Sequence, residues 1–249
     1  MDPAGQLMSA ARHPLDEAAW ASLTGPHAHF AEGTGRARRY PADVSLIAAL
    51  PPEPEEQAWA DLRALVGPGG PAMLTGPRFD FPPGWAVEFD GEGVQFVATD
   101  AFESRPAPGA VVLGAADGPA MLDLVERTRP GPFAPATYRL GTYLGIRYRG
   151  ALVAMAGERL HPPGWTEISA VCTDPAFRGR GLATALVRAV AHNIRARGET
   201  PFLHTSAQNV TAIRLYRALG FQLRRSVRFA ALRSPADACA AVSATGRKE

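Results

Sequence analysis

The chain has 249 residues, of which 46% are hydrophobic and 20% are charged, as expected for a folded globular protein with one large or two modest domains. The formal net charge of +2 and the dispersed arginines argue against a nucleic-acid-binding protein. With only two cysteines, Cys172 and Cys239, the sequence excludes a disulfide framework and a cysteine-based metal site. Arginine supplies the positive charge except at Lys248, which suggests the coding bias of a GC-rich bacterial genome.

Membrane and metal signals are both weak. The sequence contains no run of 18 apolar residues, and residues 1–23 lack the apolar core of a signal peptide. We therefore expect a cytoplasmic protein without a membrane partner. His27 and His29 are close in sequence, but no cluster of acids or cysteines accompanies them. We expect both histidines to be solvated or packed, and no metal to be bound.

The N-terminal half predicts a small α+β domain over residues 13–104, preceded by a tail at 1–12. Apolar spacing predicts one helix within 13–25 and another around Trp59 to Val66, which ends at Gly67. Three short strands are predicted, at 72–74, 85–89 and 94–98. Four acidic residues between and beside these strands are interpreted as turn residues rather than ligands: Asp80, Asp90, Glu92 and Asp100.

A proline-rich linker at 105–109 separates this half from a second domain at 110–233, and a flexible tail is predicted at 234–249. The second domain has clearer patterns of strands and helices. The predicted strands are 111–113, 140–148, 152–160, the strand containing Glu167, 202–206 and 221–232. The predicted helices are 119–128, 181–197 and 210–219.

The stretch from Glu167 to Thr184 is the strongest chemical signal in the chain. It begins as an apolar strand, stops at Asp174-Pro175 because proline cannot donate to a strand ladder, and then enters a glycine-containing turn before a helix. Free N–H groups and the helix dipole at such a turn attract anions. The turn therefore predicts a site for a phosphate or pyrophosphate.

Two motifs together resemble the GNAT N-acetyltransferase superfamily. The first is Arg-x-x-Gly-x-Ala, formed by Arg178, Gly181 and Ala183. The second, one helix and one strand later, is Asn-x-x-Ala-x-x-x-Tyr-x-x-x-Gly-Phe, which begins at Asn209 and includes Tyr216. The sequence of residues 169–173 is also similar to that of the FR47-like branch. The resemblance covers residues 110–232, and each motif is weak without the other.

The resemblance implies a mixed α/β (α+β) fold with a bent sheet, and acetyl-CoA as co-substrate. It also implies that the N-terminal half is a degenerate GNAT-like unit. The strand backbone would pair with the pantetheine arm, and the turn would bind the pyrophosphate. The implied acetyl-CoA-binding residues are Val171, Cys172, Thr173, Arg178, Gly179, Arg180, Gly181, Leu182, Ala183, Thr184, Asn209 and Tyr216.

The same resemblance implies catalytic roles for Glu167 and Tyr216. Glu167 is the candidate base for the amine, although a strand glutamate could instead bind the substrate ammonium or face solvent. Tyr216 is the candidate acid for the departing thiolate, and a backbone N–H at Val171 or Cys172 would meet the oxyanion. The expected function is acetyl transfer to the primary amine of a small molecule or amino acid, by a monomer or homodimer.

Two other functions stay open from the sequence. The first is an acyl-CoA-binding sensor without turnover, which the presence of both Glu167 and Tyr216 disfavours. The second is a protein acetyltransferase acting on a lysine or an N-terminus. That function needs an open cleft, which a helical hairpin over 122–135 would restrict.

Overall fold

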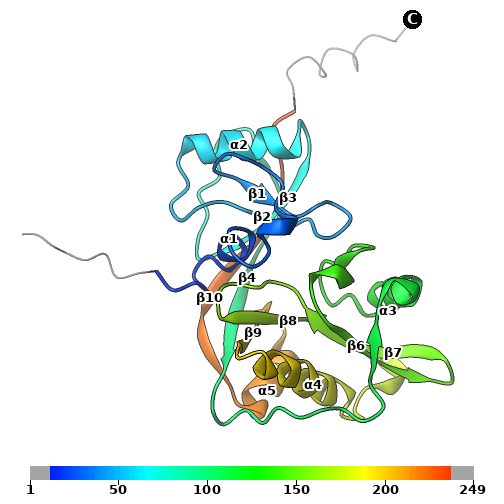
Figure 1. The fold of residues 1–249 in the computed structure, drawn as a ribbon. Helices are drawn as coiled ribbons and strands as arrows, with labels where there is room; N and C mark the ends of the chain where they lie inside the picture. The colour runs from blue at the N-terminus through cyan, green and yellow to red at the C-terminus, as the bar shows by residue number, and fades with distance from the viewer. Residues whose placement is uncertain (1–11, 237–249) are drawn as a thin grey trace, which may run out of the picture.

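One mixed sheet of eight strands organises the protein, and the computed structural model describes residues 12–236 (Figure 1). The strand order is β3–β10–β4–β9–β8–β7–β6–β5, and all neighbours are antiparallel except the parallel pair β8 and β9. The strands are β3 (Pro71–Gly76), β4 (Ala86–Ala98), β5 (Val111–Leu113), β6 (Tyr143–Tyr148), β7 (Ala151–Glu158), β8 (Trp165–Thr173), β9 (Thr200–Ser206) and β10 (Phe221–Arg233). The expected mixed α/β fold is confirmed.

Helices cover both faces of this sheet. Neighbouring strand residues point to opposite faces, and on β6 Leu144 packs into the core beneath α4 and α5, whereas Tyr143 packs into the core beneath α3. A fourth helix, α2, packs on Leu74 and Leu232 at the β3–β10 edge. The helices are α1 (Ala18–Leu23), α2 (Glu56–Val66), α3 (Gly118–Thr128), α4 (Leu182–Ala196) and α5 (Val210–Leu219).

Short elements connect the larger ones. A two-stranded sheet pairs β1 with β2 near the N-terminus, and single 3-10 turns lie between the other elements. These elements are η1 (Ala28–Phe30), β1 (Arg38–Arg39), β2 (Ala48–Ala49), η2 (Ala115–Asp117), η3 (Thr137–Leu140) and η4 (Pro175–Phe177).

Strand β4 is longer than predicted. Asp90 and Glu92 were expected in turns, but they lie inside one continuous strand that pairs along β10. The glycines between them were a turn signal in sequence. In the structure Gly91 and Gly93 instead make room for aromatic rings, since a Cβ on either would lie within 2.5 Å of a phenylalanine ring atom. The prediction of two separate strands was therefore wrong.

Both halves of the chain contribute to this sheet. β4 lies between β10 and β9, and Figure 1 shows β4 and β10 running from the N-terminal part of the molecule down to the part with α4 and α5. The boundary at 105–109 and the interpretation of the N-terminal half as a degenerate unit stay predictions. The predicted tails and Cys239 lie almost wholly outside the described residues.

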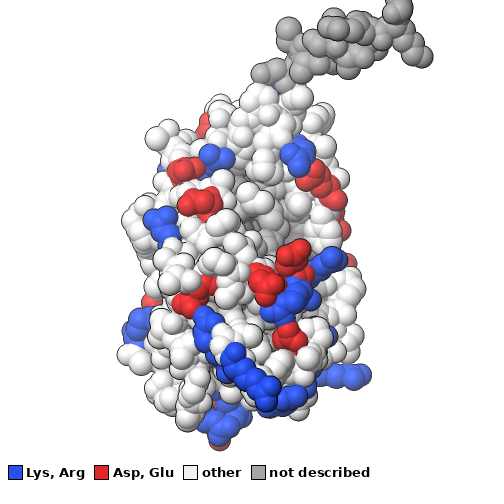
Figure 2. Space-filling model, turned by 90° about the vertical axis from the view of Figure 1, so that its right-hand side faces the viewer, with Lys and Arg blue, Asp and Glu red and all other residues white. Residues whose placement is uncertain are grey.

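Surface charge is mixed rather than of one sign. Figure 2 shows acidic and basic side chains interspersed over one face, with basic side chains gathered near its lower end and broad uncharged areas between them. Within residues 12–236, no helix has the length and apolar character needed to cross a membrane.

The shared sheet predicts that both halves unfold together. Phe202 of β9 is fully buried and packs with Leu15 and Tyr40 of the N-terminal half. We expect Phe202→Ala to lower the free energy of unfolding by about 3–5 kcal/mol, because it leaves a cavity between the halves. Urea unfolding followed by circular dichroism and by tryptophan fluorescence measures this loss.

The matched control is Val112→Ala on edge strand β5, where the side chain is 71% exposed. This change should alter the free energy of unfolding by less than about 0.5 kcal/mol. Separate transitions for the two optical probes would contradict a shared core.

Candidate functional site

The site begins where β8 and β9 diverge. Their parallel pairing runs only from Trp165–Thr200 to Glu167–Phe202. Beyond that point β9 pairs with β4 and β8 pairs with β7, so the facing edges of both strands lose their ladder partner. The backbone N–H and C=O groups of residues 168–173 on this edge are available to an extended ligand.

A bulge interrupts the pairing of β8 with β7, on the opposite edge of this strand. Cys172 pairs with Met155 and Ser169 pairs with Gly157, so two β8 residues oppose the single residue Ala156. Ala170 in the bulge has a φ of 51°, a left-handed conformation that non-glycine residues seldom adopt. Bulges next to active sites redirect backbone groups. Here the bulge lines the cavity between β8 and β9.

The predicted anion-binding turn follows β8 directly. The Asp174 carboxylate accepts a hydrogen bond from the Ala176 N–H at 2.9 Å and so orders the first part of the turn. Gly179 and Gly181 both have a φ of 75°. The Ala185 N–H donates to the Gly181 carbonyl at 3.0 Å, which is the first hydrogen bond of helix α4. The N–H groups before Ala185 in this turn therefore have no acceptor within the helix. These groups are suited to an anion.

Helix α5 forms the opposite wall. Asn209 caps it, because the side-chain oxygen accepts from the Ala212 N–H at 3.1 Å and leaves the amide NH₂ for another partner. Tyr216 lies two turns along the helix, only 6% exposed, and lines the cavity. Burial raises the pKa of Tyr216 to about 12.

The cavity has a volume of about 730 Å³. Every predicted acetyl-CoA-binding residue lines it except Arg180, whose guanidinium lies 4.9 Å above the Phe177 ring. The N-terminal half and β10 supply a second end that sequence reasoning missed: Ile47, Met73, Leu74, Thr75, Phe89 and Phe229. Thr173 lines the cavity too, and its buried Oγ1 has no hydrogen-bond partner among the described residues.

Glu167 lies at the vertex of the divergence and is fully buried. Arg159 donates to both of its oxygens, from Nε at 2.9 Å and from Nη2 at 2.6 Å. His204 of β9 contacts the same carboxylate at 2.8 Å through Nδ1. Burial alone would raise the pKa of Glu167, but the Arg159 charge and these hydrogen bonds outweigh burial and hold the pKa well below its usual range.

A chain of polar side chains surrounds the His204 ring. Arg224 can only donate, and it bonds the Gln95 side-chain oxygen at 2.8 Å. The Gln95 NH₂ therefore faces the His204 Nε2 at 2.9 Å and the Leu15 carbonyl at 2.9 Å. With the amide in this orientation, Nε2 accepts from Gln95 and Nδ1 faces the Glu167 carboxylate.

Sequence reasoning identified Glu167 but none of its partners. Arg159, His204 and Gln95 belong to no motif, and Gln95 is 109 positions from His204. The periodicity that predicts strands does not reveal which strands are neighbours. Hence no signal in the sequence could have found this network.

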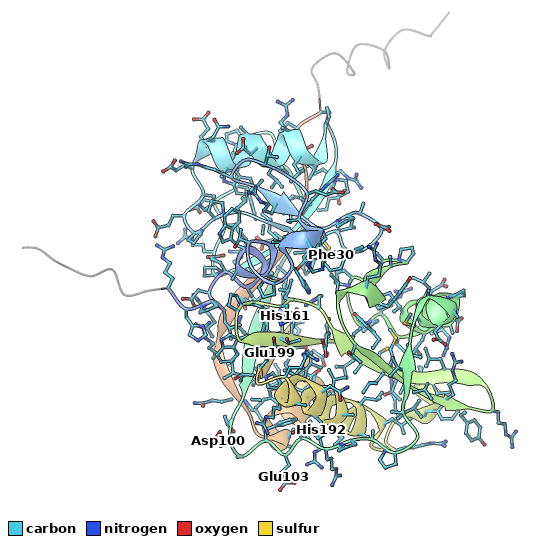
Figure 3. The ribbon with its side chains drawn as sticks, viewed as in Figure 1. Phe30, Asp100, Glu103, His161, His192 and Glu199 are labelled. Atoms are coloured by element: carbon cyan, nitrogen blue, oxygen red, sulfur yellow. The ribbon has the colours of Figure 1, made fainter. Side chains whose placement is uncertain are left out.

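A second ionisable group lies away from the cavity. Figure 3 shows the labelled side chains of His161 and Glu199 close together, and these two form an ion pair. His27 is buried beside them and contacts the Tyr40 hydroxyl at 3.0 Å, while burial lowers the pKa of His27 to about 4. His27 is therefore packed, which is one of the two roles expected for it.

In residues 12–236 no three His, Cys, Asp or Glu side chains are placed to hold a metal ion.

Comparisons with known proteins agree with this geometry. The family model described as FR47-like protein matches residues 143–230. A solved structure assigned to the GNAT acetyltransferase family, from Novosphingobium aromaticivorans, is 41% identical and has a TM-score of 0.82. That match covers 89% of this chain and 98% of the other.

Curated relatives match over shorter stretches. A mycothiol acetyltransferase from Thermobispora bispora is 31% identical over 188 residues, which is 73% of this chain and 59% of the relative. The N-alpha-acetyltransferase RimI of Mycobacterium tuberculosis is 40% identical over 83 residues, which is 32% of this chain and 51% of the relative. The chain thus spans between half and three fifths of these relatives. Because the Novosphingobium aromaticivorans structure is 41% identical and is matched over 98% of its length, the chain belongs to the GNAT acetyltransferase family, and residues 143–230 are similar to its FR47-like type.

Proposed function

We propose that the protein is an acetyl-CoA-dependent N-acetyltransferase that modifies the primary amine of a small molecule or amino acid. One observation carries this proposal: the free edge of β8 leads directly into the glycine turn at the N-terminus of α4, along one continuous cavity. An extended arm with a pyrophosphate at its end has the shape and charge that this arrangement suits.

The donor would bind by strand addition. The pantetheine amides would pair with the backbone of residues 171–173, where β9 has turned away. The Thr173 Oγ1, buried without a partner among residues 12–236, supplies one polar group for this arm. The pyrophosphate would accept from the N–H groups at 181–184, with Arg178 adding charge at the cavity wall. The Asn209 amide NH₂ is left to donate to the pantetheine.

The reaction needs no covalent enzyme intermediate. The amine nitrogen attacks the thioester carbonyl carbon, the tetrahedral oxyanion collapses, and the C–S bond breaks to release the CoA thiolate. A backbone N–H at Val171 or Cys172, beside the bulge, would stabilise the oxyanion. Tyr216 would donate a hydrogen bond or a proton to the thiolate. With a pKa of about 12 it stays protonated at neutral pH.

Glu167 receives two competing roles in this proposal. The sequence favours Glu167 as the base, but its oxygens already accept from Arg159 and His204, and its lowered pKa makes it a weak proton acceptor. We therefore favour a positioning role, in which Glu167 holds Arg159 and His204 at the cavity wall. The amine would then enter uncharged and lose its proton to water after attack.

One alternative retains support from a specific similarity. The match over 83 residues to RimI, which is named as an N-alpha-acetyltransferase, leaves a protein N-terminus open as acceptor. Thiol release from acetyl-CoA with small amines and with short peptides separates these two functions. Acetyl-CoA binding without thiol release to any amine or peptide would instead indicate a sensor.

The glycine turn predicts how donor binding is lost. We expect replacement of both Gly179 and Gly181 by Val to abolish measurable acetyl-CoA binding in titration calorimetry. A φ of 75° at both positions disfavours β-branched residues, and their Cβ atoms would project into open space beside the cavity.

The matched control is the pair Gly164→Val and Gly198→Val, with φ values of 77° and 80° and no neighbouring atoms within 4 Å. It imposes the same backbone strain away from the cavity. Equal loss of affinity in both double variants would contradict the assignment of the turn to the donor.

Tyr216 has a separate test. We expect Tyr216→Phe to lower kcat by about 10²-fold or more, because the departing thiolate loses the hydroxyl donor assigned to it. Acetyl-CoA affinity should stay within about threefold. Steady-state kinetics with the best amine measures the effect, and Tyr148→Phe, at an exposed hydroxyl on the β6–β7 hairpin, is the control. Near-normal turnover would remove Tyr216 from the mechanism.

The role of Glu167 is tested by pH dependence. Because its pKa is held low, Glu167 stays ionised from about pH 6 to about pH 9 and contributes no inflection there. The inflection in kcat/KM should therefore follow the amine, and move to lower pH with a β-fluorinated analogue of lower pKa. An inflection at the same pH for both amines would assign the limiting proton to a protein group.

A further inference from the structure

The end of the cavity opposite the pyrophosphate turn is aromatic. Phe89 of β4 and Phe229 of β10 both line it, with Met73 of β3 and Ile47 beside them. The Phe229 ring also lies 6.0 Å from the His204 ring, in an edge-to-face arrangement, at the wall formed by the Glu167 network. The aromatic end is therefore continuous with the point where β8 and β9 diverge.

Alternating glycines create this aromatic surface. A Cβ on Gly93 would lie 2.2 Å from the Phe229 ring, and a Cβ on Gly91 would lie 2.4 Å from the Phe89 ring. Each ring thus lies against bare backbone, and any larger residue at 91 or 93 would displace it. Phe89 remains 55% exposed, which leaves its surface available to a ligand.

The charges in the cavity restrict the ligand further. The charged side chains among its lining residues are Arg129, Arg159 and Arg178, and no carboxylate is among them. Arg159 is paired with Glu167, and Nδ1 of His204 contacts the same carboxylate. A second ammonium group on the acceptor would therefore be desolvated without a partner, at a large cost. Polyamines and other polycations do not suit this cavity.

We propose, as an extension of the proposed function, that the acceptor is a primary monoamine with an aromatic or similarly large apolar body. That body packs against Phe89 and Phe229, while the amine nitrogen reaches the thioester beside the β8 bulge. The N-terminal half then has a direct role, since β3, β4 and Ile47 build most of this acceptor surface. The amide and free CoA are the products.

A substrate panel tests the proposal with the full chain and acetyl-CoA. The amines are 2-phenylethylamine, ethylamine, glucosamine and 1,3-diaminopropane. Burying a phenyl ring favours binding strongly, so kcat/KM for 2-phenylethylamine should exceed that for ethylamine by about 10- to 100-fold. Glucosamine and 1,3-diaminopropane should be no better than ethylamine. A kcat/KM for glucosamine or 1,3-diaminopropane that equals or exceeds the value for 2-phenylethylamine would overturn the proposal.

Variants connect this preference to the aromatic surface. Gly93→Ala forces the Phe229 ring to move, and should reduce the preference for 2-phenylethylamine over ethylamine at least about tenfold. Phe229→Ala should do the same by removing the ring. The control is Gly114→Ala, where a Cβ would meet no atom within 4 Å and the φ of −140° suits any residue. It should leave the preference unchanged.

Acetyl-CoA affinity, measured by calorimetry without any amine, distinguishes failure of this proposal from failure of the proposed function. Loss of the aromatic preference with wild-type acetyl-CoA affinity in Gly93→Ala supports the acceptor surface. An unchanged preference in both Gly93→Ala and Phe229→Ala overturns it. If the wild-type chain does not bind acetyl-CoA or acetylates no amine, the proposed function itself fails.

Discussion

The buried contact between Glu167, Arg159 and His204 holds the centre of this protein together. Glu167 is the last β8 residue paired with β9, and its carboxylate reaches across to His204 on β9. The network thus ties the two strands at the point where they separate. Ionising a carboxylate in the core is costly, and it is tolerated here because an arginine and two further hydrogen bonds surround it. Removing one partner would leave an uncompensated charge at the vertex.

The divergence of β8 and β9 makes the site. One result is a free strand edge, to which the proposed function assigns the extended donor. The other is a cavity that is also lined by residues of β10 and β3. The bulge at Ala170 and the turn at Gly179–Gly181 both follow from this edge within a few residues. The bulge and the glycine turn on the proposed donor side are local structures, but their position depends on where β8 and β9 separate.

The acceptor side has a different origin. Its residues come from the N-terminal half and from β10, which meet only because β4 lies between β10 and β9. The curated relatives with mycothiol and N-terminal acetyltransferase names match this chain over part of their length, so their acceptors do not transfer to it directly. The aromatic surface over Gly91 and Gly93 is a property of this chain's own strands.

Local chemistry was readable from the sequence alone. The Asn209 cap and the Gly220 end of α5, the two glycines before α4, and the donor motifs depend on residues a few positions apart, and helices and turns obey such short-range rules. The family followed from them. Tertiary structure decided the rest: β4 as one strand, the partners of Glu167 and the aromatic end of the cavity. Strand pairing joins residues that are far apart in sequence, as Gln95 and His204 are, and no local pattern specifies those neighbours.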